Sequence, residues 1–306
     1  MKNKILEVKN LSVLIKERFL VKNASFSMEK GQVTALIGED RSGKTSLIKA
    51  ITGSLPITEG EVFVDGKNVK LEPKTLLNVG ICLDPPVFFK YQSVYENLSY
   101  LSKFGEGTNK AKIMNALKKF GLADKAKYKV LLLSYYEKKL MALALAFLTE
   151  PKILLLDEPF KALPENLTNA IKDHIRELQS HGTAVVVSTK NLESVEDISD
   201  QMIFMEDRQI SKILSNKQCD EYLSDKDYAF VAVKYPHYAG KIIRDNFEMK
   251  VKLLGNKVLF EGDENTITKV VKFLTQNRII LFRAGFLNKK AEKILAALTP
   301  YYKEEN

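Results

Sequence analysis

Residues 38–45 read Gly-Glu-Asp-Arg-Ser-Gly-Lys-Thr and match the phosphate-loop pattern G-x-x-x-x-G-K-[ST] at every required position. An apolar, β-prone run, residues 32–37, precedes this stretch, and a segment of helical character, Ser46 to Ile51, follows it. This strand–loop–helix setting is the one in which such a loop binds phosphate. The alternative is a glycine turn followed by a chance Lys-Thr pair. The setting favours descent from a nucleotide-binding protein.

The residue types of this phosphate loop explain how it would bind a nucleotide. Gly38 and Gly43 allow a tight backbone path that turns N–H groups onto phosphate oxygens, and the following helix adds the positive end of its dipole. Lys44 would reach the β- and γ-phosphates, and the Thr45 hydroxyl would be a ligand of Mg²⁺. The loop residues expected to bind nucleotide are Gly38, Glu39, Asp40, Arg41, Ser42, Gly43, Lys44, Thr45 and Ser46.

Composition places the chain among ordinary globular proteins. Its 306 residues, 45% hydrophobic and 28% charged, suit one large domain and a small one. Neither a membrane span nor a secretory core is evident, and Cys82 and Cys219 lack metal-ligand spacing, so we expect a protein of the reducing cytosol. The net charge of +9 includes no long basic block, which argues against nucleic-acid binding. It is compatible with a solvated surface or with work beside an anionic membrane.

The hydrophobic pattern divides the chain into two expected domains, residues 1–215 and 216–306. In the first, an alternating segment predicts antiparallel strands, and short apolar strands separated by helices predict a buried parallel sheet of the α/β class. In the second, the order β-α-β-β-α-β with a hairpin signal at Gly255-Asn256 is that of a small ferredoxin-like α+β domain. An additional helix is expected over residues 289–298.

Two acidic residues follow an apolar strand about 110 residues beyond the phosphate loop. The strand is Ile153 to Leu156, and Asp157 and Glu158 come directly after it. A strand buried on both faces delivers such acids to the carboxyl edge of the sheet, where the phosphate loop also lies. Asp157 is therefore expected to bind Mg²⁺, and Glu158 to orient or deprotonate the attacking water as the catalytic residue.

Several further segments accompany these two motifs. They are Asn10-Leu11-Ser12, Asn23-Ala24-Ser25-Phe26, Gly60-Glu61-Val62, and the stretches 80–89 and 94–98. With them, residues 5 to about 215 resemble the ATP-binding subunit of an ABC transporter, and the last two stretches are similar to the bacitracin-export and sodium-export type. The resemblance implies a P-loop NTPase fold with antiparallel β and helical subdomains, ATP and Mg²⁺ as ligands, and ATPase activity. It also implies a small C-terminal domain.

The signature segment, Leu133 to Glu137, departs from the family's Leu-Ser-Gly-Gly-Gln pattern. It reads Leu133, Ser134, Tyr135, Tyr136 and Glu137. In the family, the glycines let backbone amides approach the γ-phosphate of ATP held by the opposite subunit, and two tyrosines would prevent this approach. Glu137 would add negative charge beside that anion, whereas Ser134 could still donate one hydrogen bond. The alternative is that both tyrosines pack against a partner surface.

Other positions that the resemblance assigns to the nucleotide site also differ. Lys190 stands where a switch histidine is expected, and Asp84 stands where a glutamine is expected. Pro164 replaces an aspartate, and the adenine-stacking aromatic falls at Ile15, with Phe19 as the nearest substitute. We still expect Asp84 and Lys190 to contact the nucleotide. Together the changes predict a slow or conditional ATPase.

The interpretation that follows is the ATP-binding subunit of an export-type ABC transporter, lying on the cytoplasmic face of the cell membrane. Its expected partners are a separate polytopic membrane subunit and a second ATP-binding subunit, identical or different. The resemblance suggests an antimicrobial peptide, a drug or a lipid-like molecule as cargo. Two alternatives stay open: a degenerate subunit that pairs with a more complete ATPase, and a regulator that senses ATP without moving cargo.

Overall fold

The computed structural model divides into two compact units, Met1–Ser215 and Asn216–Asn306. The residues that the structure describes are 4–102, 108–148, 150–215, 217–218 and 228–287, with Ile294, Ala296, Thr299 and Tyr302. Gly105, Gly107, Cys219 and most of the helix expected over 289–298 therefore lie outside the described residues. No helix in the described ranges has both the length and the apolar character needed to cross a bilayer.

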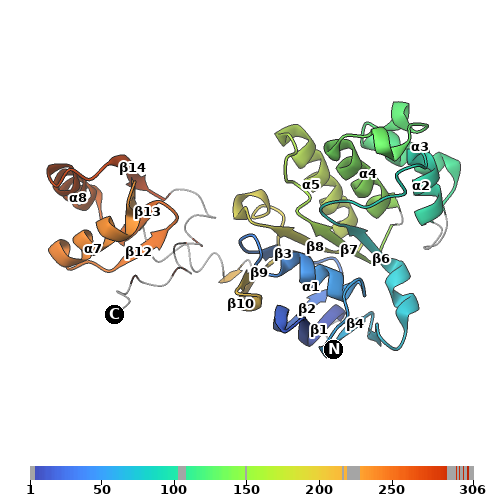
Figure 1. Ribbon diagram of the computed structural model, residues 1–306, viewed down its shortest axis with the longest axis horizontal. Helices are drawn as coiled ribbons and strands as arrows, with labels where there is room; N and C mark the ends of the chain where they lie inside the picture. The colour runs from blue at the N-terminus through green and yellow to red at the C-terminus, as the bar shows by residue number, and fades with distance from the viewer. Residues whose placement is uncertain are drawn as a thin grey trace. The chain divides into compact units, whose positions relative to one another are not determined.

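The first unit contains an antiparallel sheet and a mainly parallel sheet (Figure 1). The antiparallel sheet has the strand order β2-β1-β4-β5, as the alternating pattern near the N-terminus predicts. Its strands are β1 (Lys4–Ile15), β2 (Arg18–Glu29), β4 (Glu59–Val64) and β5 (Lys67–Asn68). Apolar side chains of β1, β2 and β4 share one hydrophobic core with the first helix and with one face of the second sheet.

The second sheet has six strands in the order β10-β9-β3-β8-β7-β6. Its strands are β3 (Val33–Ile37), β6 (Val79–Cys82), β7 (Ile153–Asp157), β8 (Ala184–Thr189), β9 (Gln201–Glu206) and β10 (Gln209–Ser215). All neighbouring pairs are parallel except β9 and β10, which form an antiparallel hairpin. Every residue of β3, β7 and β8 is buried, which confirms the parallel sheet predicted from their continuous apolar runs.

Five α-helices lie among the described residues of the first unit. They are α1 (Lys44–Ile51), α2 (Val94–Leu101), α3 (Lys110–Lys119), α4 (Tyr135–Leu148) and α5 (Glu165–Ser180). Short 3-10 turns lie at Pro73–Asn78, Ala123–Lys125, Val130–Leu132 and Leu192–Ser194. α4 packs on β6 and α5 packs on β8, and Figure 1 shows α2 and α3 gathered beyond α4. The chain therefore forms a helical region beside the parallel sheet, as the family resemblance implies.

The second unit follows the order β-α-β-β-α-β. Its elements are β11 (Tyr228–Val233), α7 (Pro236–Phe247), β12 (Val251–Leu254), β13 (Lys257–Glu261), α8 (Glu264–Gln276) and β14 (Leu281–Phe286). Its sheet is antiparallel with the strand order β12-β13-β11-β14, the arrangement of ferredoxin-like units. Residues of α7 and α8 join the apolar face of this sheet in one core.

Candidate functional site

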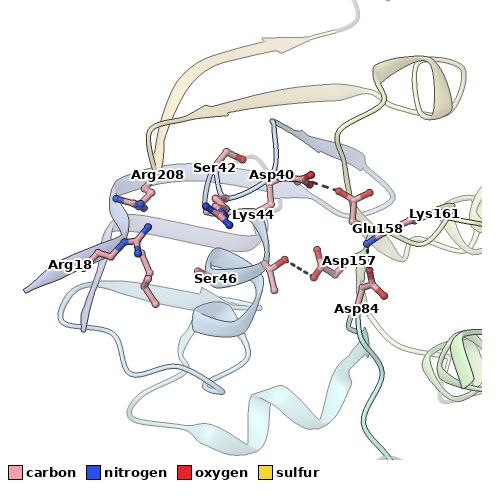
Figure 2. Close-up of a pocket in the computed structure, with 14 residues that line it drawn as sticks. Arg18, Asp40, Ser42, Lys44, Ser46, Asp84, Asp157, Glu158, Lys161 and Arg208 are labelled. Carbon is pink, nitrogen blue, oxygen red and sulfur yellow. Dashed lines mark hydrogen bonds and ion pairs between the residues drawn. The ribbon is translucent and has the colours of Figure 1, made fainter. Parts of the chain in front are cut away.

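A cavity of about 450 Å³ lies beside the carboxyl ends of β3 and β7 (Figure 2). It is lined by Arg18, Leu20, Asp40, Arg41, Ser42, Gly43, Lys44, Thr45, Ser46, Asp84, Asp157, Glu158, Lys161 and Arg208. Thr45 of the phosphate loop and Asp157, the last residue of β7, are 112 residues apart in sequence, and they meet here through a direct hydrogen bond. The parallel strands bring them together because their carboxyl ends share one edge of the sheet.

The phosphate loop has the backbone geometry that its glycines predict. Gly38 has no room for a side chain, because a Cβ there would lie 2.5 Å from both the Met205 carbonyl oxygen and Ser42 Oγ. Gly43 has a φ of 107°, and a Cβ there would lie 2.9 Å from the Leu20 carbonyl oxygen. The Ser42 hydroxyl is buried and lacks a hydrogen-bond partner among the described residues. A loop this tight turns its polar groups toward the cavity.

Lys44 begins α1 and is buried within the loop. Its Nζ donates hydrogen bonds to the carbonyl oxygens of Gly38 at 2.6 Å and Glu39 at 3.0 Å. The same Nζ lies 3.8 Å from Glu158 Oε1. No side chain caps the start of α1, and its first turn contains no acidic residue, so its N–H groups remain available to an anion.

Thr45 and Asp157 form the second part of the site. The Thr45 hydroxyl donates to Asp157 Oδ2 at 2.8 Å, and the Ser188 hydroxyl donates to Asp157 Oδ1 at 2.5 Å. Oxygen donors of this kind suit Mg²⁺, which usually binds one or two protein groups together with nucleotide phosphates. No group of three or more His, Cys, Asp or Glu side chains in the described chain could hold a metal. The oxygen atoms of Thr45 and Asp157 fit a Mg²⁺ ion that is shared with a bound nucleotide.

Glu158 has a left-handed backbone conformation, with a φ of 47°. Its backbone N–H donates to the Ser188 carbonyl oxygen at 3.1 Å and to Ser188 Oγ at 3.0 Å. Burial raises the pKa of the Glu158 carboxyl above its ordinary value; Lys44 opposes this shift and Asp157 adds to it. A carboxylate with a raised pKa, held at the edge of the cavity, is suited to accept a proton from water.

Lys139 is a functional residue that sequence reasoning missed. It is buried in α4, and its Nζ donates to the carbonyl oxygens of Glu158 at 2.5 Å and Lys161 at 2.9 Å. Burial lowers the pKa of this lysine, and Asp84 opposes the shift. The ammonium group thus links the signature helix to the backbone of the proposed catalytic residue. Its position in an otherwise apolar helical run, residues 138–147, was the only available signal.

Asp84 lies in the cavity two residues beyond β6. Its Oδ1 accepts a hydrogen bond from the Tyr135 hydroxyl, and its Oδ2 accepts one from Lys161 Nζ at 3.1 Å. The pKa of Tyr135 is raised, first by burial and then by this carboxylate. Tyr135 therefore contacts the nucleotide site of its own chain, which the alignment with the family signature did not predict.

Ser134 and Glu137 form a closed pair at the start of α4. Glu137 Oε2 accepts from the Ser134 backbone N–H at 2.7 Å and from its hydroxyl at 2.9 Å, and Ser134 Oγ accepts from the Glu137 N–H at 3.2 Å. Lys125 donates to the other carboxylate oxygen. This is a capping box. The charge of Glu137 is thus used within the chain, and the Ser134 hydroxyl that was expected to remain a donor is already bound.

Three of the expected nucleotide-binding residues do not line the cavity. Gly38 and Glu39 support it through their carbonyl oxygens, which hold Lys44. Lys190 lies 3.4 Å from Asp40 Oδ2, an exposed pair at the rim of the loop. Tyr136 is half-buried beside Tyr135.

Arg18, Lys161 and Arg208 line the cavity but were not among the expected residues. Lys161 stands three positions after Glu158, and this proximity in sequence was a signal that could have identified it. The two arginines come from hairpin turns that show no nucleotide-binding pattern. Only the packing of the antiparallel sheet and the β9–β10 hairpin against the phosphate loop brings them to the site.

Comparison with known proteins places this geometry in a family. The family model described as "ABC transporter" matches residues 21–161. The ABC transporter ATP-binding protein YdbJ of Bacillus subtilis is 30% identical over 71% of each chain, and YhcH of the same organism is 27% identical over 98% of each chain. The lantibiotic transport ATP-binding protein SrtF of Streptococcus pyogenes is 27% identical over 71% of this chain and 92% of its own.

A solved structure shows the same fold. It is the dimeric, post-hydrolysis state of an ATP-binding cassette bound to ADP and phosphate, and it matches with a TM-score of 0.63 and 22% identity. The match covers 69% of this chain and 98% of that cassette. The sequence relatives and the fold agree with the phosphate loop and the acids at the end of β7. The chain belongs to the ABC transporter ATP-binding proteins, a family of ATPases.

Proposed function

We propose that this chain is the ATP-hydrolysing subunit of an export-type ABC transporter, acting on the cytoplasmic face of a membrane with a separate polytopic membrane subunit. The observation that carries this proposal is the convergence of Lys44, Thr45, Asp157 and Glu158 on one cavity. The Thr45–Asp157 hydrogen bond is 2.8 Å long, and Lys44 Nζ lies 3.8 Å from Glu158. These are the groups that ATP hydrolysis requires: a phosphate-binding cation, oxygen ligands and a base.

Each group has a distinct role in this proposal. Lys44 and the amides of the phosphate loop bind the β- and γ-phosphates. Thr45 and Asp157 hold Mg²⁺, which neutralises phosphate charge when bound. Glu158 orients the attacking water and accepts its proton, and the raised pKa of its carboxyl brings it closer to the neutral range in which a base works best. Lys139 positions Glu158 through its carbonyl oxygen.

Export of an antimicrobial peptide, a drug or a lipid-like molecule is the proposed task. Support comes from the sequence resemblance to export-type subunits and from the name of one relative, the lantibiotic transport protein SrtF. Two chains of this type would close over ATP and move the membrane subunit. We propose a slow ATPase, because the signature segment has two tyrosines where the family pattern has two glycines.

A second candidate, a degenerate subunit that pairs with a more complete ATPase, is favoured by the capping box of α4. In this box the Ser134 amide and hydroxyl bind a charged carboxylate, which would repel the γ-phosphate of the opposite subunit, where the family pattern has a neutral glutamine. A partner chain with an intact signature would supply the contacts with the γ-phosphate that the signature segment of this chain does not make. The nucleotide site formed by residues 38–45 of this chain would then be the one completed by the partner.

The test uses the chain purified with its membrane subunit. Glu158→Gln keeps the shape of the side chain and removes its charge, so ATP binding should persist while turnover falls about 10²-fold. Glu150→Gln, which changes an exposed carboxylate paired with Lys112, is the matched control and should leave turnover unchanged. If Glu158→Gln hydrolyses ATP as fast as the wild type, Glu158 is only a carboxylate at the end of a strand. Failure to isolate any membrane subunit would favour the ATP-sensing regulator.

A further inference from the structure

We propose that Arg18 and Arg208 bind the nucleoside end of the nucleotide, with their guanidinium planes against the base in place of an aromatic ring. This inference rests on the proposed nucleotide site and adds the residues that select its ligand. Both arginines line the cavity, and Figure 2 shows them on the far side of Lys44 from Asp157 and Glu158. Since the acids mark the γ-phosphate end, the arginines mark the opposite end.

Two hairpin turns of the same type position these arginines. Lys16 and Glu17, between β1 and β2, have φ values of 47° and 63°, and Asp207 and Arg208, between β9 and β10, have 45° and 67°. Positive φ at both central residues is the mark of the tight type I′ turn. Arg18 directly follows the first turn. The two side chains therefore start from short, rigid connections instead of long loops.

The turn between β9 and β10 is joined both to β2 and to the phosphate loop. The Lys22 backbone N–H donates to the Arg208 carbonyl oxygen at 2.7 Å, which joins β2 to the β9–β10 hairpin. A Cβ at Gly43 would lie 3.3 Å from Arg208 Cα, so the backbone of this turn packs directly on the loop. The distance between the arginines and the phosphate-binding groups is thereby set by the fold.

Strand alternation explains why an arginine occupies this place. Arg18 and Leu20 lie on the same face of β2 and line the cavity, whereas Phe19 points to the other face. Neither Phe19 nor Ile15, the positions expected to stack on adenine, lines the cavity. Leu20 supplies an apolar contact. A guanidinium group supplies a planar cation that stacks on the π face of a base.

The two arginines also determine the sign of the net charge of the cavity lining. Five basic and four acidic side chains line it, and without Arg18 and Arg208 the balance would be three basic to four acidic. A polyanion would then meet a net negative site. Neither guanidinium group makes a hydrogen bond or ion pair with a described residue, so both groups can bind a ligand.

The test compares ATP with inorganic tripolyphosphate, which carries phosphate charge but no base, by titration calorimetry on the full chain. Arg18→Ala with Arg208→Ala should weaken ATP about tenfold or more, and tripolyphosphate about threefold or less. Arg18→Lys with Arg208→Lys keeps the charge and loses the plane, so it should still weaken ATP more than tripolyphosphate. Lys16→Gln removes a charge from the same turn without reaching the cavity and is the control.

Each outcome has a defined meaning. If the arginine variants weaken both ligands equally, the arginines act only as general charge and the base contact is wrong. If neither ligand is affected while Lys44→Ala weakens both, the nucleotide site stands and the arginines have no part in it. If Lys44→Ala also leaves both affinities unchanged, the site assignment itself fails.

Discussion

The Tyr135 hydroxyl donates a hydrogen bond to Oδ1 of Asp84. Tyr135 opens α4 within the signature segment, and Asp84 lines the cavity that contains Lys44 and Glu158. Lys161 holds the other oxygen of the same carboxylate at 3.1 Å. A tyrosine at a position where the family pattern has glycine therefore makes a contact inside its own chain.

Tyr135→Phe removes only this hydrogen bond and should raise the rate of ATP hydrolysis. Asp84 is then held by Lys161 alone and can turn toward a bound nucleotide at lower cost. A hydrogen bond to a charged carboxylate stabilises by about 1.5–3 kcal/mol, so turnover should rise about tenfold or more. Tyr136→Phe, at the neighbouring position, is the control in a steady-state ATPase assay. A rate below that of the wild type would show that the contact supports catalysis.

Glu158→Gln should make the protein more stable to heat at pH 8 than the wild type. The pKa of Glu158 is raised in the folded state above its ordinary value of 4.5, so the folded protein binds this proton more tightly than the unfolded chain does. The free energy of unfolding of the wild type therefore falls as the pH rises from 4.5 through the folded-state pKa of Glu158. Thermal melts of both proteins should differ at pH 8 and converge near pH 4. A gap that persists at pH 4 would have another cause.

Lys139→Met should slow hydrolysis more than it weakens ATP binding. The change leaves the carbonyl oxygens of Glu158 and Lys161 without their ammonium donor and costs about 1–3 kcal/mol of stability. Because Lys139 acts through the backbone of Glu158, turnover should fall while the Kd for ATP changes little. Lys138→Met, one position earlier and only half-buried, is the control. Equal losses in Kd and turnover would indicate general unfolding of the site.

Restoring the signature segment should create an ATP-dependent homodimer. In the Glu158→Gln background, Tyr135→Gly, Tyr136→Gly and Glu137→Gln together remove both rings and the carboxylate charge from the start of α4. Glutamine can still serve in a capping box, so the helix should remain formed. Light scattering with Mg-ATP measures the mass. A tight dimer of the protein with its natural signature would contradict the slow-ATPase proposal, and no dimer in either protein would point to Pro164, Lys190 or a missing partner.

The regular parts of this fold could be predicted because local patterns determine them. The continuous apolar runs of β7 and β8 and the hairpin signal at Gly255-Asn256 depend on neighbours in sequence, and β12 and β13 pair as a hairpin around those two residues. The bounds of β14 are set differently, since its pairing with β11, which is distant in sequence, determines that it starts at Leu281.

The site was predictable only where one segment carries its own chemistry. Lys44 and Thr45 belong to a motif whose spacing is local, and they lie where that motif predicts. Arg18, Lys139 and Arg208 could not be predicted, because each reaches the site through packing between elements distant in sequence. The pairing of Glu137 could not be predicted for a related reason: its ion pair with Lys125 depends on how two separate segments pack.

The capping box has an evolutionary consequence. Substituting either tyrosine by glycine would leave the other ring in place and the Ser134 amide bound to Glu137, and substituting Glu137 by glutamine alone would leave both rings in place. No single substitution toward the Leu-Ser-Gly-Gly-Gln sequence exposes the amides at the start of α4, because at least one tyrosine ring remains after each of them. A lineage that acquired this arrangement would therefore tend to keep it and to adapt its partners around it.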